Sequence, residues 1–339
     1  MSVQSRVGST LDFGAKGKRW GRLSVPYSHH ASAYGHIPIP IAVIVGERPG
    51  PTALLTGGVH GDEYEGQIAL ADLVRDVDPA DVRGRLIVLP STNLPAALAH
   101  RRTSPIDEGN LARLFPGERD GTVTKLIAWH VESVLMPMCD LSLDCHAGGS
   151  SLDYLPCTLA REPDEAKRPA TWDALLAFGA PYACVVRTGR AADGTVSPGD
   201  DRTLLAAALR NGIDAIAVEL GGQGTVTPST LAVTRRGLLN MLAHWGLIEA
   251  RHRVAAPSIA ATIEPAQHVF APRRGVFAPL FTLGDRIADG AIVGHVHDLE
   301  QPEEPGVPVR ARAGGIVVCR RVPARIEPGD CLFQLCEPA

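Results

Sequence analysis

The most constraining feature of this chain is an alternation, from about residue 41 to residue 246, of short apolar runs with longer stretches of helical periodicity. The apolar runs are expected to form strands at 41–46, 52–56, 85–90, 141–146, 182–188 and 213–220. Helices are expected between them at about 65–76, 122–136, 165–178, 201–211 and 229–247. Continuous Val, Ile and Leu runs separated by helices predict an α/β fold, with a mixed, mostly parallel sheet flanked by helices.

The character of the chain changes after about Arg253. The stretch AAPSIAATIEPAQ indicates a Pro/Ala-rich linker, and short β-type runs punctuated by Gly and Pro follow it. We therefore expect an α/β domain over 1–253 and a small all-β domain over 267–339. The Gly-Asp turns of the second domain resemble barrel-sandwich domains that carry lipoyl or biotinyl lysines. Because the last lysine of the chain is Lys167, such attachment is excluded, and this domain is expected to be structural or to form a lid.

Composition narrows the class of protein. With 45% hydrophobic residues, 21% charged residues and a net charge of −4, the chain is typical of a globular protein without the basic face that nucleic acids require. The N-terminus lacks the layout of a signal peptide, and no apolar run is long enough to span a membrane. Seven scattered cysteines without a CxxC pair indicate reduced thiols. These features predict a cytoplasmic protein with no nucleic-acid or membrane partner, and they leave a homo-oligomer open.

The segment TGGVHGDEYEG follows an apolar run and contains His60 and Glu63. A catalytic zinc usually has three protein ligands, and open α/β sheets place ligand sites at the carboxyl ends of their strands. Gly57, Gly58 and Gly61 allow the backbone to turn sharply here. By itself, His-x-x-Glu fits a metal site or a polar turn about equally well.

A second His-x-x-Glu match, His297 with Glu300, is a poor candidate. His297 lies in a β-type run, where side chains three residues apart point to opposite faces. We interpret this pair as solvated side chains.

Two more strand ends carry candidate residues. His146 closes the run LSLDCH, and Asp144 lies on the same strand face, where it could orient a ligand histidine. Glu219 ends the apolar run IDAIAVEL, where burial would raise the pKa of its carboxyl toward that of a general base. The alternatives are a capped strand end for His146, a hydrogen-bonded loop acid for Asp144 and a solvated sheet edge for Glu219.

Taken together, GGVHGDEYEG, NLPAALAHRRTSPIDEGNLARLFPG, LDCHAGG and VELGGQG resemble the succinylglutamate desuccinylase/aspartoacylase family, relatives of the zinc carboxypeptidases. The resemblance covers about residues 40–250, and the β C-terminal domain looks like that family's appended domain. It implies a zinc-carboxypeptidase-like fold. It also implies a zinc-dependent amidohydrolase that removes an acyl group from a small N-acyl amino acid, with one Zn²⁺ per chain.

The same resemblance implies roles for individual residues. His60, Glu63 and His146 would be the zinc ligands, and Glu219 would be the base that activates water. Arg102 would polarise the scissile carbonyl and stabilise its oxyanion. The neighbouring arginine at position 101 leaves the register of that assignment open.

A substrate-carboxylate clamp is implied at Arg113, in LARLFPG. The family pattern has Asn before this arginine, whereas this chain has Ala112. We expect Asn110 or a backbone group to substitute for the missing amide.

Within the family, the segments are most similar to the N-acetyl-diaminobutyrate deacetylases of ectoine breakdown, which implies hydrolysis of N2-acetyl-L-2,4-diaminobutanoate. The acids considered for attracting the free amine of that substrate are Asp62, Glu65, Asp107 and Glu108. The competing hypotheses are a deacylase for another acyl amino acid of the aspartoacylase or succinylglutamate desuccinylase type, a C-terminal-trimming metallocarboxypeptidase and a non-catalytic ligand-binding relative. Cobalt or manganese would also suit two histidines and a carboxylate.

Overall fold

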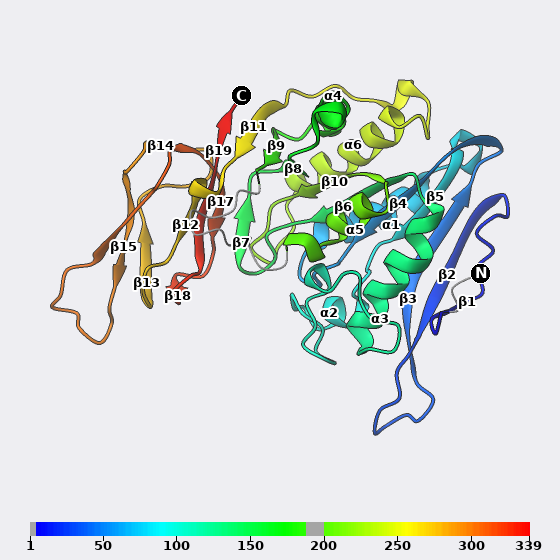
Figure 1. Cartoon of the computed structure of the whole chain (residues 1–339), viewed down its shortest axis with the longest axis horizontal. Helices are drawn as coiled ribbons and strands as arrows, with labels where there is room; N and C mark the ends of the chain where they lie inside the picture. The colour runs from blue at the N-terminus through cyan, green and yellow to red at the C-terminus, as the bar shows by residue number, and fades with distance from the viewer. Residues whose placement is uncertain (1–4, 188–199) are drawn as a thin grey trace.

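A long twisted sheet runs through the whole molecule (Figure 1). The structure is a computed structural model that describes residues 5–187 and 200–339. Hydrogen-bonded neighbours in the sheet follow the order β1-β2-β3-β5-β4-β6-β10-β8-β9-β11-β19-β17-β14. The strands up to residue 263 are β1 (Gly8–Ser9), β2 (Gly17–Pro26), β3 (His36–Val45), β4 (Arg48–Gly57), β5 (Arg83–Leu89), β6 (Leu141–His146), β7 (Leu152–Tyr154), β8 (Cys157–Arg161), β9 (Tyr182–Val186), β10 (Asp214–Glu219) and β11 (Ile259–Ile263).

The centre of the sheet is parallel, and helices cover both of its faces. β4 runs parallel to β5 and β6, and β6 runs parallel to β10. The α-helices are α1 (Tyr64–Asp76), α2 (Leu94–Leu98), α3 (Val123–His130), α4 (Arg168–Phe178), α5 (Leu204–Arg210) and α6 (Pro228–His244). Neighbouring residues of β4 separate the two cores: Leu55 packs in the cluster that includes α1, α4 and α6, while Leu54 packs in the cluster that includes α3 and α5. The α/β fold with a mixed sheet flanked by helices is confirmed, and parallel pairing is found at the centre of the sheet, while its outer strands pair antiparallel.

Each apolar run that was expected to form a strand does so, with ends shifted by a few residues. The expected helix over 122–136 is α3 followed by a π-helical turn, Val131–Leu135. β8 was missed because Cys157–Arg161 contains polar and charged residues and is not a continuous apolar run. The last residues of the expected strand at 182–188 reach position 188, which lies outside the described residues.

The stretch expected to be a linker contains a strand instead. β11 pairs in parallel with β9 and antiparallel with β19, so the sheet continues from the α/β body into the C-terminal strands. This strand was missed because alanine and threonine dominate it, and only Ala261 and Ile263 are fully buried. The linker interpretation was therefore wrong.

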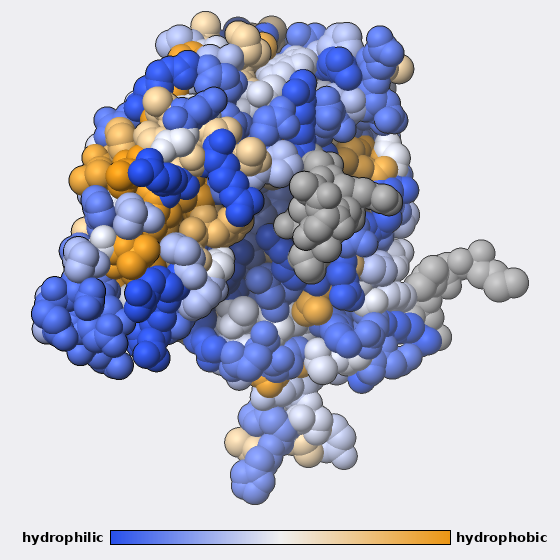
Figure 2. Space-filling view, turned by 60° about the vertical axis from the view of Figure 1, so that its left-hand side comes forward, coloured by the Kyte–Doolittle hydropathy of each residue, from blue (hydrophilic) through white to orange (hydrophobic). Residues whose placement is uncertain are grey.

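The C-terminal strands build a second, smaller core. They are β12 (His268–Phe270), β13 (Gly275–Pro279), β14 (Arg286–Ile287), β15 (Ile292–His297), β16 (Val307–Arg310), β17 (Gly315–Arg321), β18 (Arg325–Ile326) and β19 (Cys331–Pro338). Four of them form a separate antiparallel sheet, β16-β15-β13-β18, which shares an apolar core with β17 and β19. Figure 2 shows apolar surface gathered on one side of the molecule. Among residues 268–339, the exposed large apolar side chains include Phe270, Leu280 and Leu299.

The cysteines and the helices bear on two expectations from the sequence, reduced thiols and the absence of a membrane-spanning segment. All seven cysteines are free, five of them are buried, and four of these five lie in apolar clusters. Within the described residues, no helix is both long and apolar enough to cross a membrane.

Candidate active site

Parallel pairing brings three of the predicted residues to one edge of the sheet. β4 and β6 are neighbours, with Gly57 opposite Cys145, so the loop that leaves β4 meets the end of β6. His60 lies in that loop, Glu63 immediately precedes α1, and His146 is the last residue of β6. The carboxyl edge of a parallel sheet is where such folds place ligand sites.

Small residues make this corner possible. A Cβ atom built on Gly61 would lie 2.0 Å from the backbone carbonyl carbon of Ala96, so no side chain fits at this position. A Cβ on Gly66, in the first turn of α1, would lie 2.4 Å from Cβ of Cys145. The glycines therefore let α1 and the His60 loop approach the neighbouring backbone closely.

The side chains of His60, Glu63 and His146 converge on one point. Oε1 of Glu63 lies 2.7 Å from Nδ1 of His60, and Oε2 of Glu63 lies 2.8 Å from Nδ1 of His146. One potential ligand atom from each residue lies within 4.8 Å of the other two. His60 and Glu63 are almost fully buried. Among the described residues, this is the one group of His, Cys, Asp and Glu side chains arranged to hold a metal ion.

The outer nitrogen of each imidazole meets an oxygen acceptor. Nε2 of His146 lies 2.7 Å from Oδ2 of Asp144, and Nε2 of His60 lies 3.1 Å from Oδ1 of Asn110. Asp144 is held in turn by the Thr56 hydroxyl, which donates to Oδ1 at 2.7 Å. An Nε2–H that donates outward leaves the Nδ1 lone pair free to bind a cation beside Glu63. Two imidazoles and one carboxylate arranged in this way fit the donor set of a catalytic zinc.

The electrostatics of Glu63 suit a ligand carboxylate. Burial opposes its ionisation, but the two histidines together hold the pKa of this carboxyl well below its usual range. The backbone N–H of Ala147 also donates to Oε2 of Glu63 at 3.2 Å. Glu63 is therefore kept ionised, as a metal ligand must be.

Glu219 ends β10, the strand next to β6, and pairs in register with His146. Its Oε2 atom is buried and has no hydrogen-bond partner among the described residues. Burial raises the pKa of this carboxyl to about 8, with a further contribution from the nearby charge of Glu63. A carboxylate with an elevated pKa beside a metal site has the properties of a general base.

The structure separates the two neighbouring arginines. Nη1 of Arg102 lies 3.4 Å from Oε1 of Glu63, so its guanidinium faces the cluster and is 40% exposed. Arg101 points elsewhere and donates to Oε2 of Glu108 at 2.5 Å. Of the two, Arg102 is the one placed to reach a group bound at the cluster.

Arg113 and Asn110, the residues expected to bind the substrate carboxylate, have side-chain contacts with different residues. Arg113 is exposed at the end of a 3-10 turn, Leu111–Arg113, and its Nη1 donates to the carbonyl oxygen of Ala112 at 2.9 Å. The Asn110 amide, expected to replace the missing family asparagine, has its Oδ1 atom 3.1 Å from Nε2 of His60. Sequence reasoning missed this contact because fifty positions separate the two residues and no periodicity links them.

Each acid that was considered for amine recognition has a partner of its own. Asp62 and Glu65 are buried: the Ser150 backbone N–H and hydroxyl donate to Asp62, each at 2.8 Å, and the Thr230 hydroxyl donates to Glu65. The carboxyl of Asp107 accepts from the backbone and hydroxyl of Thr124. Glu108 pairs with Arg101. Each of the four carboxylates is therefore engaged by another residue of the chain in this conformation.

His297 and Glu300 behave as solvated side chains. His297 is exposed at the end of β15, and Glu300 is exposed in the bend that follows. They are not among the residues that could hold a metal ion.

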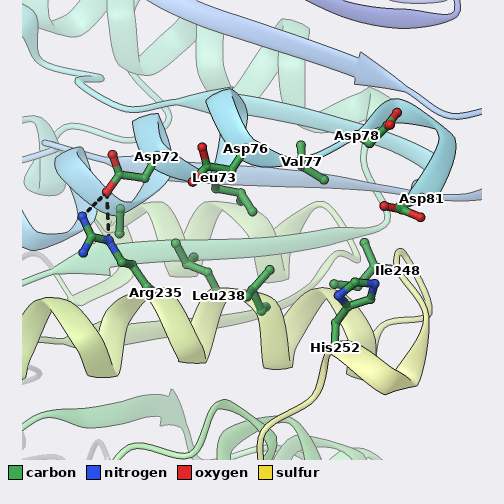
Figure 3. Close-up of a pocket in the computed structure, with 12 residues that line it drawn as sticks. Asp72, Leu73, Asp76, Val77, Asp78, Asp81, Arg235, Leu238, Ile248 and His252 are labelled. Carbon is green, nitrogen blue, oxygen red and sulfur yellow. Dashed lines mark hydrogen bonds and ion pairs between the residues drawn. The ribbon is translucent and has the colours of Figure 1, made fainter.

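A separate pocket lies between α1 and α6 (Figure 3). It has a volume of about 320 Å³ and an apolar floor that includes Leu73 and Leu238. At one end, Asp72 accepts a hydrogen bond from Nε of Arg235 at 2.9 Å and so joins the two helices. No residue of the His60 cluster lines this pocket.

We expect Gly61→Ala to destabilise the protein and to lower its metal content. The new methyl group would meet backbone atoms of Ala96 and Ala97, which cannot move aside as a flexible side chain can, so we expect a loss of about 3 kcal/mol or more in the free energy of unfolding. Urea unfolding and metal analysis of the purified protein measure both effects. Gly8→Ala is the control, since its methyl group would meet only Cβ of Ser24 at 3.8 Å. Equal stability of the two variants would contradict this prediction.

Similarity to known proteins agrees with this geometry. The model of the succinylglutamate desuccinylase/aspartoacylase catalytic domain matches residues 49–245. The chain is 40% identical over 337 residues to the N-alpha-acetyl-L-2,4-diaminobutyric acid deacetylase of Halomonas elongata, with 98% of this chain and 95% of that protein covered.

Solved structures, among them the following two, match this chain over nearly its whole length. The product-bound structure of the ectoine utilization protein EutE (DoeB) from Ruegeria pomeroyi has a TM-score of 0.90 and 37% identity and covers 99% of both chains. A succinylglutamate desuccinylase/aspartoacylase from Rhodobacter sphaeroides has a TM-score of 0.90 and 36% identity and covers 99% of this chain and 100% of its own. The resemblance inferred from the sequence is thus confirmed, and the chain belongs to the succinylglutamate desuccinylase/aspartoacylase family.

Proposed function

We propose that this protein is a zinc-dependent deacetylase that hydrolyses N2-acetyl-L-2,4-diaminobutanoate to acetate and L-2,4-diaminobutanoate. The observation that carries the proposal is the 40% identity, over nearly the entire chain, to a deacetylase named for this substrate. The convergent side chains of His60, Glu63 and His146 support it with a donor set that fits zinc. On this proposal the protein acts in the degradation of ectoine, the process for which the related EutE (DoeB) is named.

The proposed roles follow from the positions of the side chains. His60, Glu63 and His146 would hold one zinc ion, which when bound supplies Lewis-acid polarisation and lowers the pKa of a coordinated water. Glu219 would accept the proton of the attacking water and deliver it to the leaving amide nitrogen. Glu219 is at the end of β10, in register with His146 of the neighbouring strand. From this position one carboxyl group would carry out both proton transfers, from the attacking water and to the leaving nitrogen.

Arg102 would stabilise the negative charge that develops on the acyl oxygen. Its guanidinium already faces Glu63 at 3.4 Å, and a donor that is fixed before the reaction loses little free energy to reorganisation. Asp144 and Asn110 would keep the Nδ1 lone pairs of the two ligand histidines directed at the ion.

Arg113 would bind the substrate carboxylate as a bidentate fork. Ala112 is buried and offers no side-chain donor, so the arginine would act without the amide that the family pattern supplies. We also propose that Asn110 serves the His60 imidazole in preference to the substrate, because its Oδ1 atom lies within hydrogen-bond distance of Nε2.

We extend the proposal to the location of the enzyme and to its division into domains. We propose that the enzyme acts in the cytoplasm on a freely diffusing amino-acid derivative, which is consistent with its seven free cysteines. We also propose that residues 1–253 form the catalytic domain and 267–339 a β domain of barrel-sandwich type.

A panel of substrates tests the proposal. Purified protein loaded with one equivalent of zinc would be assayed with N2-acetyl-diaminobutanoate, N-acetyl-aspartate, N-succinyl-glutamate and a set of dipeptides, with release of the free amine as the signal. We expect the highest kcat/KM for N2-acetyl-diaminobutanoate. Preference for acetyl-aspartate or succinyl-glutamate would assign another deacylase of the family, and preference for dipeptides would assign a carboxypeptidase. Binding without any turnover would indicate a non-catalytic relative.

A further inference from the structure

Among the residues that the structure describes, no side chain or backbone group hydrogen-bonds the buried Oε2 atom of Glu219. The position of this atom therefore depends on the backbone. On the N-terminal side, β10 fixes this backbone by pairing Glu219 with His146 of β6 and Cys157 of β8. On the C-terminal side, the chain leaves the sheet after residue 219 and enters the loop GGQG, residues 221–224.

That loop has little conformational preference of its own. Gly221 and Gly224 have φ angles of 93° and 63°, which glycine adopts readily. Gln223 also lies in the left-handed region, with φ 62°, which costs a residue with a side chain about 1 kcal/mol. A non-glycine residue keeps such a conformation when its surroundings impose it.

Hydrogen bonds to the segment that follows His146 hold the loop, including Gln223, in this conformation. The backbone N–H groups of Gly148 and Tyr154 donate to the carbonyl of Gly221 at 2.9 and 3.0 Å, and Gln223 N–H donates to the carbonyl of Leu152 at 3.0 Å. The Gln223 side chain makes one further contact across the same gap. Its Nε2 atom donates at 2.7 Å to Oδ2 of Asp153, which is the residue between two of these anchors.

Asp153 is in turn held by the C-terminal strands. It is 7% exposed, and its Oδ2 accepts from Nη2 and Nε of Arg320 at 3.1 and 3.3 Å. β7 pairs with β17 so that Arg320 lies directly opposite Asp153. A carboxylate this deeply buried is costly unless a cation compensates it, so loss of the arginine would leave Asp153 uncompensated.

We propose that Arg320 is a positioning residue for the reaction: through Asp153 and Gln223, it fixes the loop that follows Glu219 and so aims the general base. The inference rests on the proposed function for the role of Glu219. It gives the C-terminal strands a specific part in catalysis, because β17 supplies the charge that holds the loop.

The neighbouring residue offers a matched control. Arg321 lies on the same strand and also pairs with an aspartate, but its Nη2 lies 2.9 Å from Asp330 within the C-terminal strands. Arg320→Met and Arg321→Met each remove one ion pair from β17, and only the first touches the loop after Glu219. For Arg320→Met we expect kcat on N2-acetyl-diaminobutanoate to fall by about 10- to 100-fold, while KM and zinc content stay within about 2-fold.

A charge-conserving variant distinguishes a positioning role of Arg320 from a general loss of protein stability. Arg320→Lys keeps the positive charge and should recover most of the lost kcat, whereas Arg321→Met should keep wild-type kcat even where its melting temperature falls. Asp153→Asn, which removes the charge with little change of shape, should lower kcat in the same direction. If Arg320→Met does not fold, the kcat of Asp153→Asn tests the proposal in its place. Wild-type kcat in Arg320→Met or Asp153→Asn, or an equal loss in Arg321→Met, would overturn the proposal.

A second readout does not depend on turnover. Hydrogen–deuterium exchange of the zinc-free protein should be faster for amides 220–224 in Arg320→Met than in wild type or Arg321→Met. Unchanged exchange there would also reject the positioning role. If the loop loosens but the wild-type protein does not hydrolyse the acetyl substrate, the proposed function is wrong and the structural link through Asp153 stands.

Discussion

Glu219→Gln should abolish deacetylation while leaving the zinc site intact. The amide cannot accept the proton of the attacking water, and general-base catalysis is worth roughly 10²- to 10⁴-fold, so we expect kcat to fall by about that factor. Zinc content should stay near one ion per chain, because Glu219 is not among the three residues whose ligand atoms converge. The measurements are steady-state kinetics on N2-acetyl-diaminobutanoate and metal analysis of the same preparation.

The control for this variant is Glu300→Gln, which removes an exposed carboxylate from the second His-x-x-Glu pair. It should have wild-type kcat. Glutamine at 219 also removes a carboxyl whose pKa burial raises to about 8, so the substitution should not lower stability at neutral pH. A Glu219→Gln enzyme with near-normal kcat would refute the assignment of Glu219 as the base.

Replacing His60 or His146 by alanine should remove the zinc and the activity together. Each imidazole supplies one of three ligand atoms, and two remaining ligands cannot hold a catalytic ion tightly. A bound metal contributes several kcal/mol to stabilisation of the transition state, so kcat/KM should fall by roughly 1000-fold or more. Metal analysis after dialysis and kinetics in metal-free buffer measure the two losses.

The matched control is His297→Ala, which removes the histidine of the other His-x-x-Glu pair and should change neither quantity. Chelation offers an independent test on the unaltered protein: exhaustive treatment with a chelator should abolish turnover, and one equivalent of zinc should restore it. Full activity after chelation, or in the His60→Ala, His146→Ala double variant, would show that no metal is needed.

The sequence was informative about residues that occupy strand ends. Apolar runs report burial directly, and the run LSLDCH became β6 with the expected bounds. His146 and Glu219 could be placed at one sheet edge in advance, because parallel strands that alternate with helices end on the same side. The family resemblance then connected Arg102 and Arg113 to these strand ends, which no periodicity could have done.

Contacts between loops that are far apart in the chain could not be predicted from apolar patterning or from the order of the strands. The sequence could not separate Arg101 from Arg102, because both lie outside any strand or helix and their directions depend on the fold of that loop. The contact of Asn110 with His60 was likewise not foreseen, and its expected contact with the substrate stays a prediction. Arg320 could not be predicted either, because it lies 101 positions after Glu219 and is linked to the Glu219 loop through Asp153.

The amino-acid sequence by itself determined the class of fold and the strand ends that carry His146 and Glu219, because these depend on local apolar patterning. Only the tertiary structure decided which arginine faces the His60, Glu63 and His146 cluster, that residues 259–263 form a strand inside the sheet, and how the C-terminal strands reach the Glu219 loop. These features depend on hydrogen bonds and ion pairs between side chains far apart in the chain, and such pairings leave no periodic trace in the sequence.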